Sequence, residues 1–180
     1  MPLKPGSYAL GPDDATLTVK TERKGAAAKA GHDLVIDVTS WSATLDVGAE
    51  PSATALSLTA DSRSLRVRAG TGGMTSLGDE EKAAIAQTID DEILEGAPIE
   101  FRSSGVEAGV DGGLRVTGDL AIGDARHPVA FDLAVDGDGR LTGGARLLQT
   151  DWGIKPYSAL FGALKVADEV EVEIDATQSR

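Results

Sequence analysis

The two histidines, His32 and His127, are the side chains of this chain best suited to acid–base or metal chemistry near neutral pH. Asp33 follows His32 directly, but neighbouring residues of a strand point to opposite faces, so this pair predicts no shared site. Neither histidine lies in a spacing typical of a metal site or a catalytic triad. We therefore expect neither histidine to be catalytic and expect no metal site.

Nucleophilic catalysis has little support in the sequence. The chain has no cysteine, which excludes a thiolate nucleophile, a disulfide and a zinc ribbon. It also has no Gly-x-Ser-x-Gly motif of the kind that exposes a serine nucleophile at a sharp turn. We therefore expect no catalytic residues, no cofactor and no enzymatic activity.

A glycine-rich segment at 70–73 stands where a phosphate-binding loop would be, after the strand-like segment 65–67 and before a helix. Asp79 and Glu80, however, occupy the positions at which such a loop has Lys and Ser or Thr. Carboxylates at those positions would repel a phosphate group. We interpret the segment as a flexible connection between strand and helix.

The charge balance excludes several classes of partner. Lys and Arg number 17 against 29 Asp and Glu, which gives a formal net charge of −12. This charge repels a nucleic-acid backbone and disfavours steady attachment to an anionic membrane surface, although brief collisions remain compatible with it. No window reaches the ~18 apolar residues of a spanning helix, so we expect no stable membrane insertion. Residues 1–10 lack an apolar leader, and a cytoplasmic location is expected.

Alternation of apolar and polar residues indicates that β-strands position most side chains. Val170, Val172 and Ile174 alternate with acidic residues, and the segment 41–47 alternates in the same way. Parallel strands would read as continuous apolar runs, so this one-sided pattern favours antiparallel strands. Asp-Gly turns at 111–113 and 136–139 lie between alternating runs, as hairpins require.

One segment, 79–95, has the period of a helix instead. Ile85, Ile89 and Ile93 recur at a spacing of four, and Gly96 ends the pattern. The narrow apolar stripe predicts a single amphipathic helix that packs on the strands.

Length and periodicity together predict one all-β domain over 1–180, with about eight antiparallel strands and the inserted helix. Periodicity alone fits an up-and-down barrel or a sandwich. An eight-stranded barrel is just wide enough to fill its interior with side chains or to hold one small ligand.

Short motifs give the chain a likeness to one known family. They are Gly118-Asp119-Leu120-Ala121 followed by Arg126-His127-Pro128-Val129, then Gln149-Thr150-Asp151-Trp152-Gly153-Ile154, Ala167-Asp168-Glu169-Val170, Pro98-Ile99-Glu100-Phe101-Arg102-Ser103 and Gly31-His32. By these motifs the chain resembles the YceI-like family of lipid-binding barrels along nearly its whole length. Gln149 stands where the family has Arg, and the segment 155–165 is an insert.

The resemblance implies an extended antiparallel β-barrel of lipocalin type, with a helix beside it and an apolar pore that takes a polyisoprenoid or a similar amphiphile. Dimers are usual in that family, so a homodimer is implied as well. Membership generally implies no enzymatic activity.

The leading hypothesis is therefore binding, storage or transport of an apolar amphiphile, such as an isoprenoid quinone, a polyprenyl lipid or a fatty-acid-like molecule. We expect apolar residues to line the pore, aromatic residues to lie near its opening and a histidine to contact the ligand's polar head. The pore residues are Trp41, Ile99, Phe101, Leu120, Ile122, Phe131, Val170 and Val172, those at the opening are Trp152, Tyr157 and Phe161, and the histidine is His32.

Two alternatives stay open. The same inward residues could pack against one another in a filled barrel that serves as a structural or protein-interaction module. A lipid hydrolase or isomerase would need two buried carboxylates, or a histidine and a carboxylate, inside the pore. The aromatic stretch 152–166 fits a lid that meets an apolar ligand or a membrane, and equally a dimer surface or core packing over one barrel end.

Overall fold

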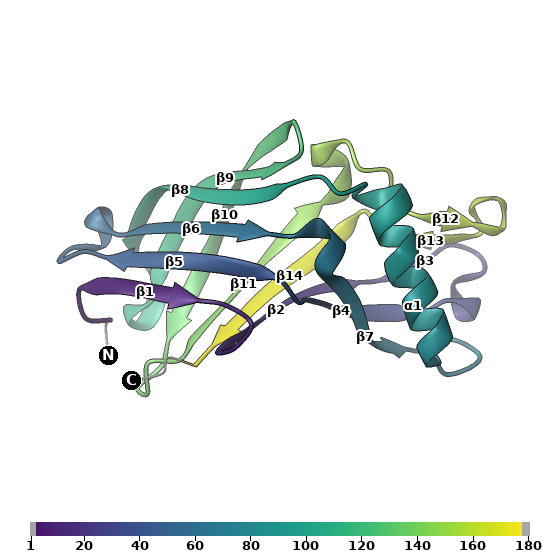
Figure 1. Ribbon diagram of the computed structural model, residues 1–180, viewed down its shortest axis with the longest axis horizontal. Helices are drawn as coiled ribbons and strands as arrows, with labels where there is room; N and C mark the ends of the chain where they lie inside the picture. The colour runs from purple at the N-terminus through teal and green to yellow at the C-terminus, as the bar shows by residue number, and fades with distance from the viewer. Residues whose placement is uncertain (1–2, 178–180) are drawn as a thin grey trace.

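The computed structural model describes residues 3–177 and consists of one curled antiparallel sheet, one helix and a small accessory sheet (Figure 1). In sheet order the eleven strands are β1 (Gly6–Leu10), β5 (Trp41–Val47), β6 (Ala55–Ala60), β8 (Ile99–Ala108), β9 (Leu114–Ile122), β10 (Ala125–Val135), β11 (Leu141–Leu148), β14 (Glu169–Ala176), β2 (Ala15–Thr21), β4 (Asp33–Val38) and β7 (Leu65–Thr71). The expected all-β antiparallel architecture is confirmed, whereas the expected count of about eight strands was too low.

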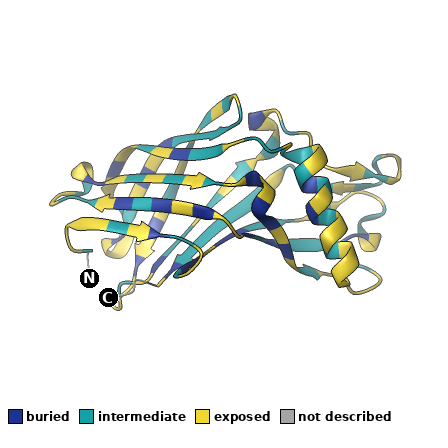
Figure 2. Ribbon diagram, viewed as in Figure 1, coloured by how far each residue is buried: buried dark blue, intermediate teal, exposed yellow. Residues whose placement is uncertain are grey.

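Alternation along each strand decides which face of the sheet turns inward. Trp41, Ala43 and Leu45 of β5 are buried, while Ser42 and Asp46 at alternate positions are exposed. The same alternation of buried and exposed residues runs along most strands in Figure 2. The apolar face lies inside the curl because side chains two residues apart share one side of a strand.

The two ends of the sheet are held together by a corner in the chain, formed by Thr39–Ser40 and 61–64. Only Thr39 and Ser40 separate β4 from β5, and only 61–64 separate β6 from β7. β4 pairs with β2 and β7 at one end of the sheet order, while β5 pairs with β1 and β6 at the other. The segments 33–47 and 55–71 therefore each run from one end of the sheet order to the other. This continuity curls the sheet toward a barrel.

Ser64 supplies most of the hydrogen bonds at this corner. Its carbonyl oxygen accepts from the Thr39 backbone N–H at 3.0 Å and from the Thr39 hydroxyl at 2.7 Å. Its own hydroxyl accepts from the Ser40 N–H at 3.0 Å and donates to the Asp61 carbonyl at 2.7 Å. Ser62 and Ser64 are both buried, so these bonds replace contacts with water.

Replacing Ser64 with Ala is expected to lower the free energy of unfolding by about 1 to 2 kcal/mol, because the Ser40 N–H loses its partner. The urea midpoint of unfolding measures this change. Ser42→Ala is the matched control, since that hydroxyl is exposed and contacts only Thr59. Equal midpoints for the two variants would show that the corner does not stabilise the fold.

The predicted helix is present as α1 (Asp79–Thr88), and it continues as a wider π-helical turn over Ile89–Ile93. Gly96, with a φ of 71°, lies just beyond its end, as expected for a glycine that follows a helix. α1 packs beside β7 at one end of the curled sheet (Figure 1). Among residues 3–177, no helix is long and apolar enough to cross a bilayer.

The accessory sheet lies at the same end as α1 (Figure 1) and consists of β12 (Ser158–Ala159), β13 (Leu164–Val166) and β3 (Arg23–Lys24). The β12–β13 hairpin is the insert seen in the sequence. Short 3₁₀ turns occupy Ala28–Ala30, Pro51–Ala53, Ser62–Ser64, Val110–Gly112, Gln149–Trp152 and Leu160–Gly162.

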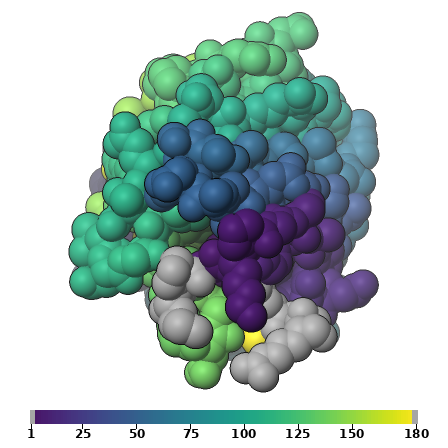
Figure 3. Space-filling model, turned by 90° about the vertical axis from the view of Figure 1, so that its left-hand side faces the viewer, coloured from purple at the N-terminus to yellow at the C-terminus, as the bar shows by residue number. Residues whose placement is uncertain are grey.

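The opposite end of the sheet, which we call the β1 end, is filled by side chains. Leu45, Val116, Leu141 and Ala176 are at most 2% exposed there. Figure 3 looks onto this end, where β1 lies against the blue β5–β6 region. The core is therefore concentrated at the β1 end, away from α1.

Candidate functional site

A cavity of about 650 Å³ lies inside the curled sheet and is lined mainly by aliphatic and aromatic side chains. The inward faces of the strands form most of its wall, and Ile85, Ile89 and Ile93 complete the wall from the helical side. The helical stripe seen in the sequence thus faces the cavity. Within residues 3–177, no Asp or Glu belongs to the lining.

The cavity reaches the surface at the α1 end. Tyr157 lines it there and is 43% exposed, and Arg23 and Lys165 of the accessory sheet also line it. At the β1 end the lining residues Leu45 and Leu141 are almost fully buried, which closes the cavity.

Ten of the twelve residues expected at the site line this cavity. They are His32, Ile99, Phe101, Leu120, Ile122, Phe131, Trp152, Tyr157, Val170 and Val172. They come from strands far apart in the sequence, which the curl of the sheet brings around one space.

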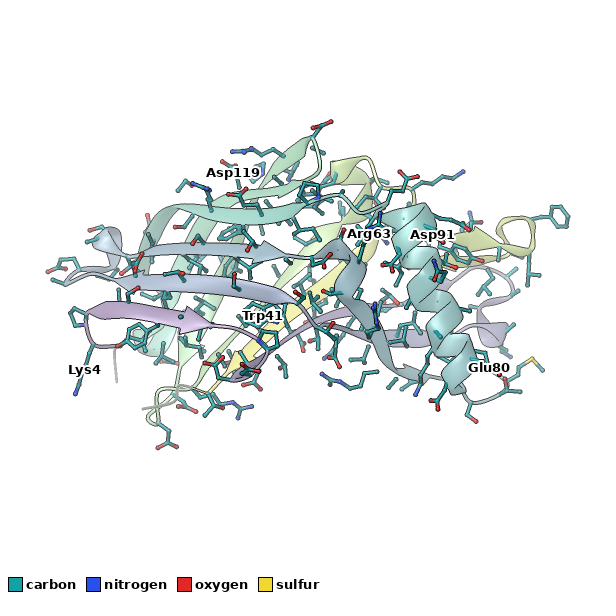
Figure 4. All side chains as sticks on the ribbon, in the orientation of Figure 1. Lys4, Trp41, Arg63, Glu80, Asp91 and Asp119 are labelled. Atoms are coloured by element: carbon teal, nitrogen blue, oxygen red, sulfur yellow. The ribbon has the colours of Figure 1, made fainter. Side chains whose placement is uncertain are left out.

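Trp41 does not line the cavity as expected. It is buried in the core cluster that contains Leu10 and Val38, and its indole N–H has no hydrogen-bond partner among the described residues. Figure 4 shows Trp41 beside the segment that follows β1. Trp41 begins β5 directly after the corner, so its side chain packs where the two ends of the sheet meet.

Phe161 also lies outside the lining, at the tip of the β12–β13 hairpin. Its relative exposure of 113% shows that it makes almost no packing contact. Its φ of 55° places it in the left-handed region, and this turn directs the ring into solvent.

Two aromatic contacts shape one wall of the cavity. The rings of Phe101 on β8 and Phe131 on β10 lie 5.5 Å apart with an interplanar angle of 56°, a favourable tilted geometry. The Trp152 indole N–H donates to the Leu120 carbonyl at 2.8 Å, which fixes the ring orientation. Trp152 also makes an edge contact with His127, at 5.3 Å between ring centroids.

Polar side chains enter the lining mainly at the α1 end. They are Thr21, Arg23, His32, Thr88, Gln149, Tyr157 and Lys165. His32 Nε2 donates to the Thr75 carbonyl at 2.6 Å and so ties the start of β4 to the 72–78 loop. A Cβ at Gly73 would lie 2.4 Å from Nε2, so the ring would have to shift, and the φ of 75° at this position also favours glycine.

Sequence reasoning missed a large part of the wall. Leu17, Val19 and Ile36 of β2 and β4 line the cavity, as does Gln149. The first three share the inward alternation that identified β14, so the same signal could have found them. Gln149 carries no such signal, because its placement depends on the turn at Gln149–Trp152.

Asp168 holds this turn in place. Its carboxylate accepts from the Thr150 hydroxyl at 2.6 Å and from the Thr150 backbone N–H at 2.9 Å. These bonds, the hydroxyl first, lower the pKa of Asp168. The side chain of Gln149 donates to the Ala167 carbonyl at 3.1 Å and is held by the same turn.

Asp168→Asn is expected to lower the melting temperature at neutral pH and to have less effect as the pH falls. A carboxyl whose pKa is lowered by folding adds stability above its unfolded pKa of about 3.9, and this contribution is lost as the pH falls through the lowered value. Thermal unfolding at a series of pH values measures it. Asp138→Asn is the control, because no hydrogen bond to the Asp138 carboxylate is found within residues 3–177. A constant difference from pH 7 to pH 3 would contradict the assignment.

A curled antiparallel sheet with an inserted helix and an internal apolar cavity defines the class as a half-barrel fold with a hollow interior. The match of residues 8–178 to the YceI-like domain shows the family. This chain belongs to the YceI-like family.

Solved structures support the same fold. BcnA of Burkholderia cenocepacia superposes with a TM-score of 0.66 at 16% identity, covering 92% of this chain and 96% of that chain. A mutant YceI protein of Campylobacter jejuni with a monobromobimane guest gives a TM-score of 0.51 at 14% identity, covering 81% and 85%. At these identities the likeness shows the fold alone. No curated protein sequence gives a significant match.

Proposed function

We propose that this protein binds, stores or carries an apolar amphiphile, such as an isoprenoid quinone or a polyprenyl lipid, inside the curled sheet. The observation that supports this proposal most directly is the cavity of about 650 Å³. Its volume falls in the range of about 300 to 1,000 Å³ that is typical of small-molecule sites.

The distribution of side chains favours one orientation of the ligand. Burial of a hydrocarbon chain is worth ~0.8 kcal/mol per CH₂ group, and the apolar wall extends to Leu45 and Leu141 at the β1 end. His32, Gln149 and Tyr157 offer hydrogen-bonding groups at the other end. A bound amphiphile would therefore place its tail toward the β1 end and its polar head near α1.

We also propose that the protein acts without catalysis. A lipid hydrolase or isomerase would need two carboxylates, or a histidine with a carboxylate, in the cavity, and the lining has no carboxylate among the described residues. The histidine–carboxylate pair of His127 and Asp151, 3.8 Å apart, lies outside the lining and is partly exposed.

Native mass spectrometry of the freshly purified protein, followed by solvent extraction, tests the proposed function. We expect a stoichiometric apolar adduct, or saturable binding at one site of an environment-sensitive fluorophore with an alkyl tail. A bare chain that refuses added quinones, polyprenols and the fluorophore would instead favour a filled barrel with a structural or protein-interaction role.

A cytoplasmic location and a homodimer are also part of the proposal. Cell fractionation tests the first, and the mass of the protein in solution tests the second.

A further inference from the structure

The tip of the β12–β13 hairpin exposes two large apolar side chains side by side. Leu160 is 59% exposed, and Phe161 has a relative exposure of 113%. Both residues adopt left-handed backbone conformations, with φ of 52° and 55°. This conformation is unfavourable for residues other than glycine, and strained backbone of this kind is often found at functional sites. The hairpin thus holds an apolar tip in water.

Lysines lie close to this tip. Lys165 belongs to β13 and faces Lys24 of β3, and Lys29 lies in the turn Ala28–Ala30, which packs against β13. Lys155 precedes β12 in the chain. Within residues 3–177, none of these four lysines forms an ion pair. The segments 23–32 and 154–167 contain no Asp or Glu, although the chain as a whole carries a net charge of −12.

Two of these lysines face each other directly in the accessory sheet. Lys24 pairs with Lys165 in the β3–β13 register. Like charges at directly opposed positions destabilise a sheet, and an anion held between them would remove that cost. After the hydrogen bond from the Thr150 hydroxyl, the charge of Lys24 also helps to lower the pKa of the nearby Asp168 carboxyl, so the repulsion is partly offset within the chain. An anionic partner at this face would offset the rest.

The apolar tip and the basic residues adjoin the end at which the cavity reaches the surface. Arg23, Tyr157 and Lys165 line the cavity and also belong to the accessory sheet or its hairpin. Figure 1 shows this sheet next to α1, at the end away from the N-terminus. A surface that contacts this end would meet the cavity opening, the apolar tip and the basic residues together.

We propose that this face, composed of the apolar tip Leu160–Phe161 and the four lysines near it, docks the protein reversibly on an anionic lipid bilayer. Leu160 and Phe161 would enter the interface, where an exposed aromatic ring is favourable, and the basic side chains would lie at the lipid phosphates. The docked orientation would place the cavity opening against the bilayer.

The charge of the whole chain is compatible with such local docking. Screening limits electrostatic interactions to about 8 Å at physiological ionic strength, so carboxylates farther than this from the lipid phosphates add little repulsion. The first turn of α1, at the same end (Figure 1), carries Asp79, Glu80 and Glu81, and docking requires an orientation that keeps these carboxylates beyond that distance. Two apolar side chains and a few lysines give reversible binding and not insertion.

A second copy of this chain fits the face less well. A two-fold dimer places the same patch of each copy against the other. Lys24, Lys165 and their basic neighbours would then face the same positive charges, which repel. The anionic bilayer is the partner whose charge complements this face.

Vesicle sedimentation at low ionic strength tests the proposal. We expect the full chain to sediment with phosphatidylcholine vesicles that contain phosphatidylglycerol and to remain in the supernatant with phosphatidylcholine alone. The double variant Leu160→Asn/Phe161→Asn removes the apolar tip while keeping residues that tolerate a left-handed backbone. Lys24→Gln/Lys29→Gln removes two charges. Each variant should bind anionic vesicles at least about tenfold more weakly than the original chain.

Val110→Asn is the matched control. Val110 is 78% exposed and lies beyond the far end of β8, whose ten residues separate it from the α1 end. It should bind vesicles like the original chain. Absence of binding to anionic vesicles, or equal binding by the tip variant and the control, would overturn the proposal. Loss of self-association in the tip variant with unchanged vesicle binding would overturn it in favour of a dimer surface.

This docking is independent of what fills the cavity. Leu160 and Phe161 do not line it, so a water-soluble alkyl fluorophore should bind the tip variant and the original chain equally. Failure of fluorophore binding would count against the proposed function, and failure of vesicle binding against the docking face.

Discussion

Phe131→Asp is expected to abolish retention of an apolar ligand. Phe131 lines the cavity and packs against Phe101, 5.5 Å away between ring centroids. A carboxylate at this position would lie in an apolar wall that contains no other charged group nearby on β8, β9 or β10. Placing a charge there costs several kcal/mol, so we expect affinity for an alkyl fluorophore to fall by at least about 100-fold.

Two further variants control this experiment. Glu171→Ala changes a residue of β14 that lies outside the cavity lining and should leave affinity unchanged. Ala145→Phe adds a ring to the cavity from β11 and should weaken binding while leaving the unfolding midpoint equal or higher. Equal ligand retention by Phe131→Asp and Glu171→Ala would refute the proposed site. The Ala145 variant keeps the test decisive even where Phe131→Asp fails to fold.

Leu45→Ala should give the largest loss of stability. Leu45 is 1% exposed on β5 and faces Tyr8 of β1 and Leu56 of β6 in the ladder register. Truncating a fully buried leucine removes its transfer free energy and leaves an enlarged cavity, so we expect a loss of about 3 kcal/mol. The urea midpoint of unfolding measures this loss.

Leu148→Ala is the control for this substitution, because Leu148 is 43% exposed at the end of β11. It should shift the midpoint much less. Comparable shifts for the two variants would show that the β1 end is not the stabilising core described here.

Local sequence patterns were sufficient to predict most individual strands. The segment 169–176 alternates Val and Ile with acidic residues, and it forms β14 between β11 and β2. One-sided burial is encoded locally, since each strand of a curled antiparallel sheet has one inner and one outer face. The helix was predictable for the same reason, from its four-residue spacing.

The number of strands and the way the sheet curls could not be predicted in this way. Only Thr39 and Ser40 separate β4 from β5. In the sequence these two polar residues look like part of one longer strand and do not mark its end. Their role depends on hydrogen bonds to Ser64, more than twenty positions away in the chain. Such contacts leave no periodic signal.

The candidate site shows the same limit. Alternation placed residues such as Ile122 and Val172 correctly on the cavity wall, because it identifies the inner face of a strand. It could not distinguish Trp41, which shares that face but packs beside the corner. Nor could it show that a cavity remains inside, since inward apolar residues look alike around a ligand and around each other.

The pairing of β2 with β14 has a consequence for how the protein is made. These two strands lie side by side, although about 150 residues separate them in the sequence. Contacts of such long range form late and fold slowly, and during synthesis β2 must wait until β14 has left the ribosome. The cavity wall is complete only after that step, so any ligand must be loaded after β14 has been synthesised.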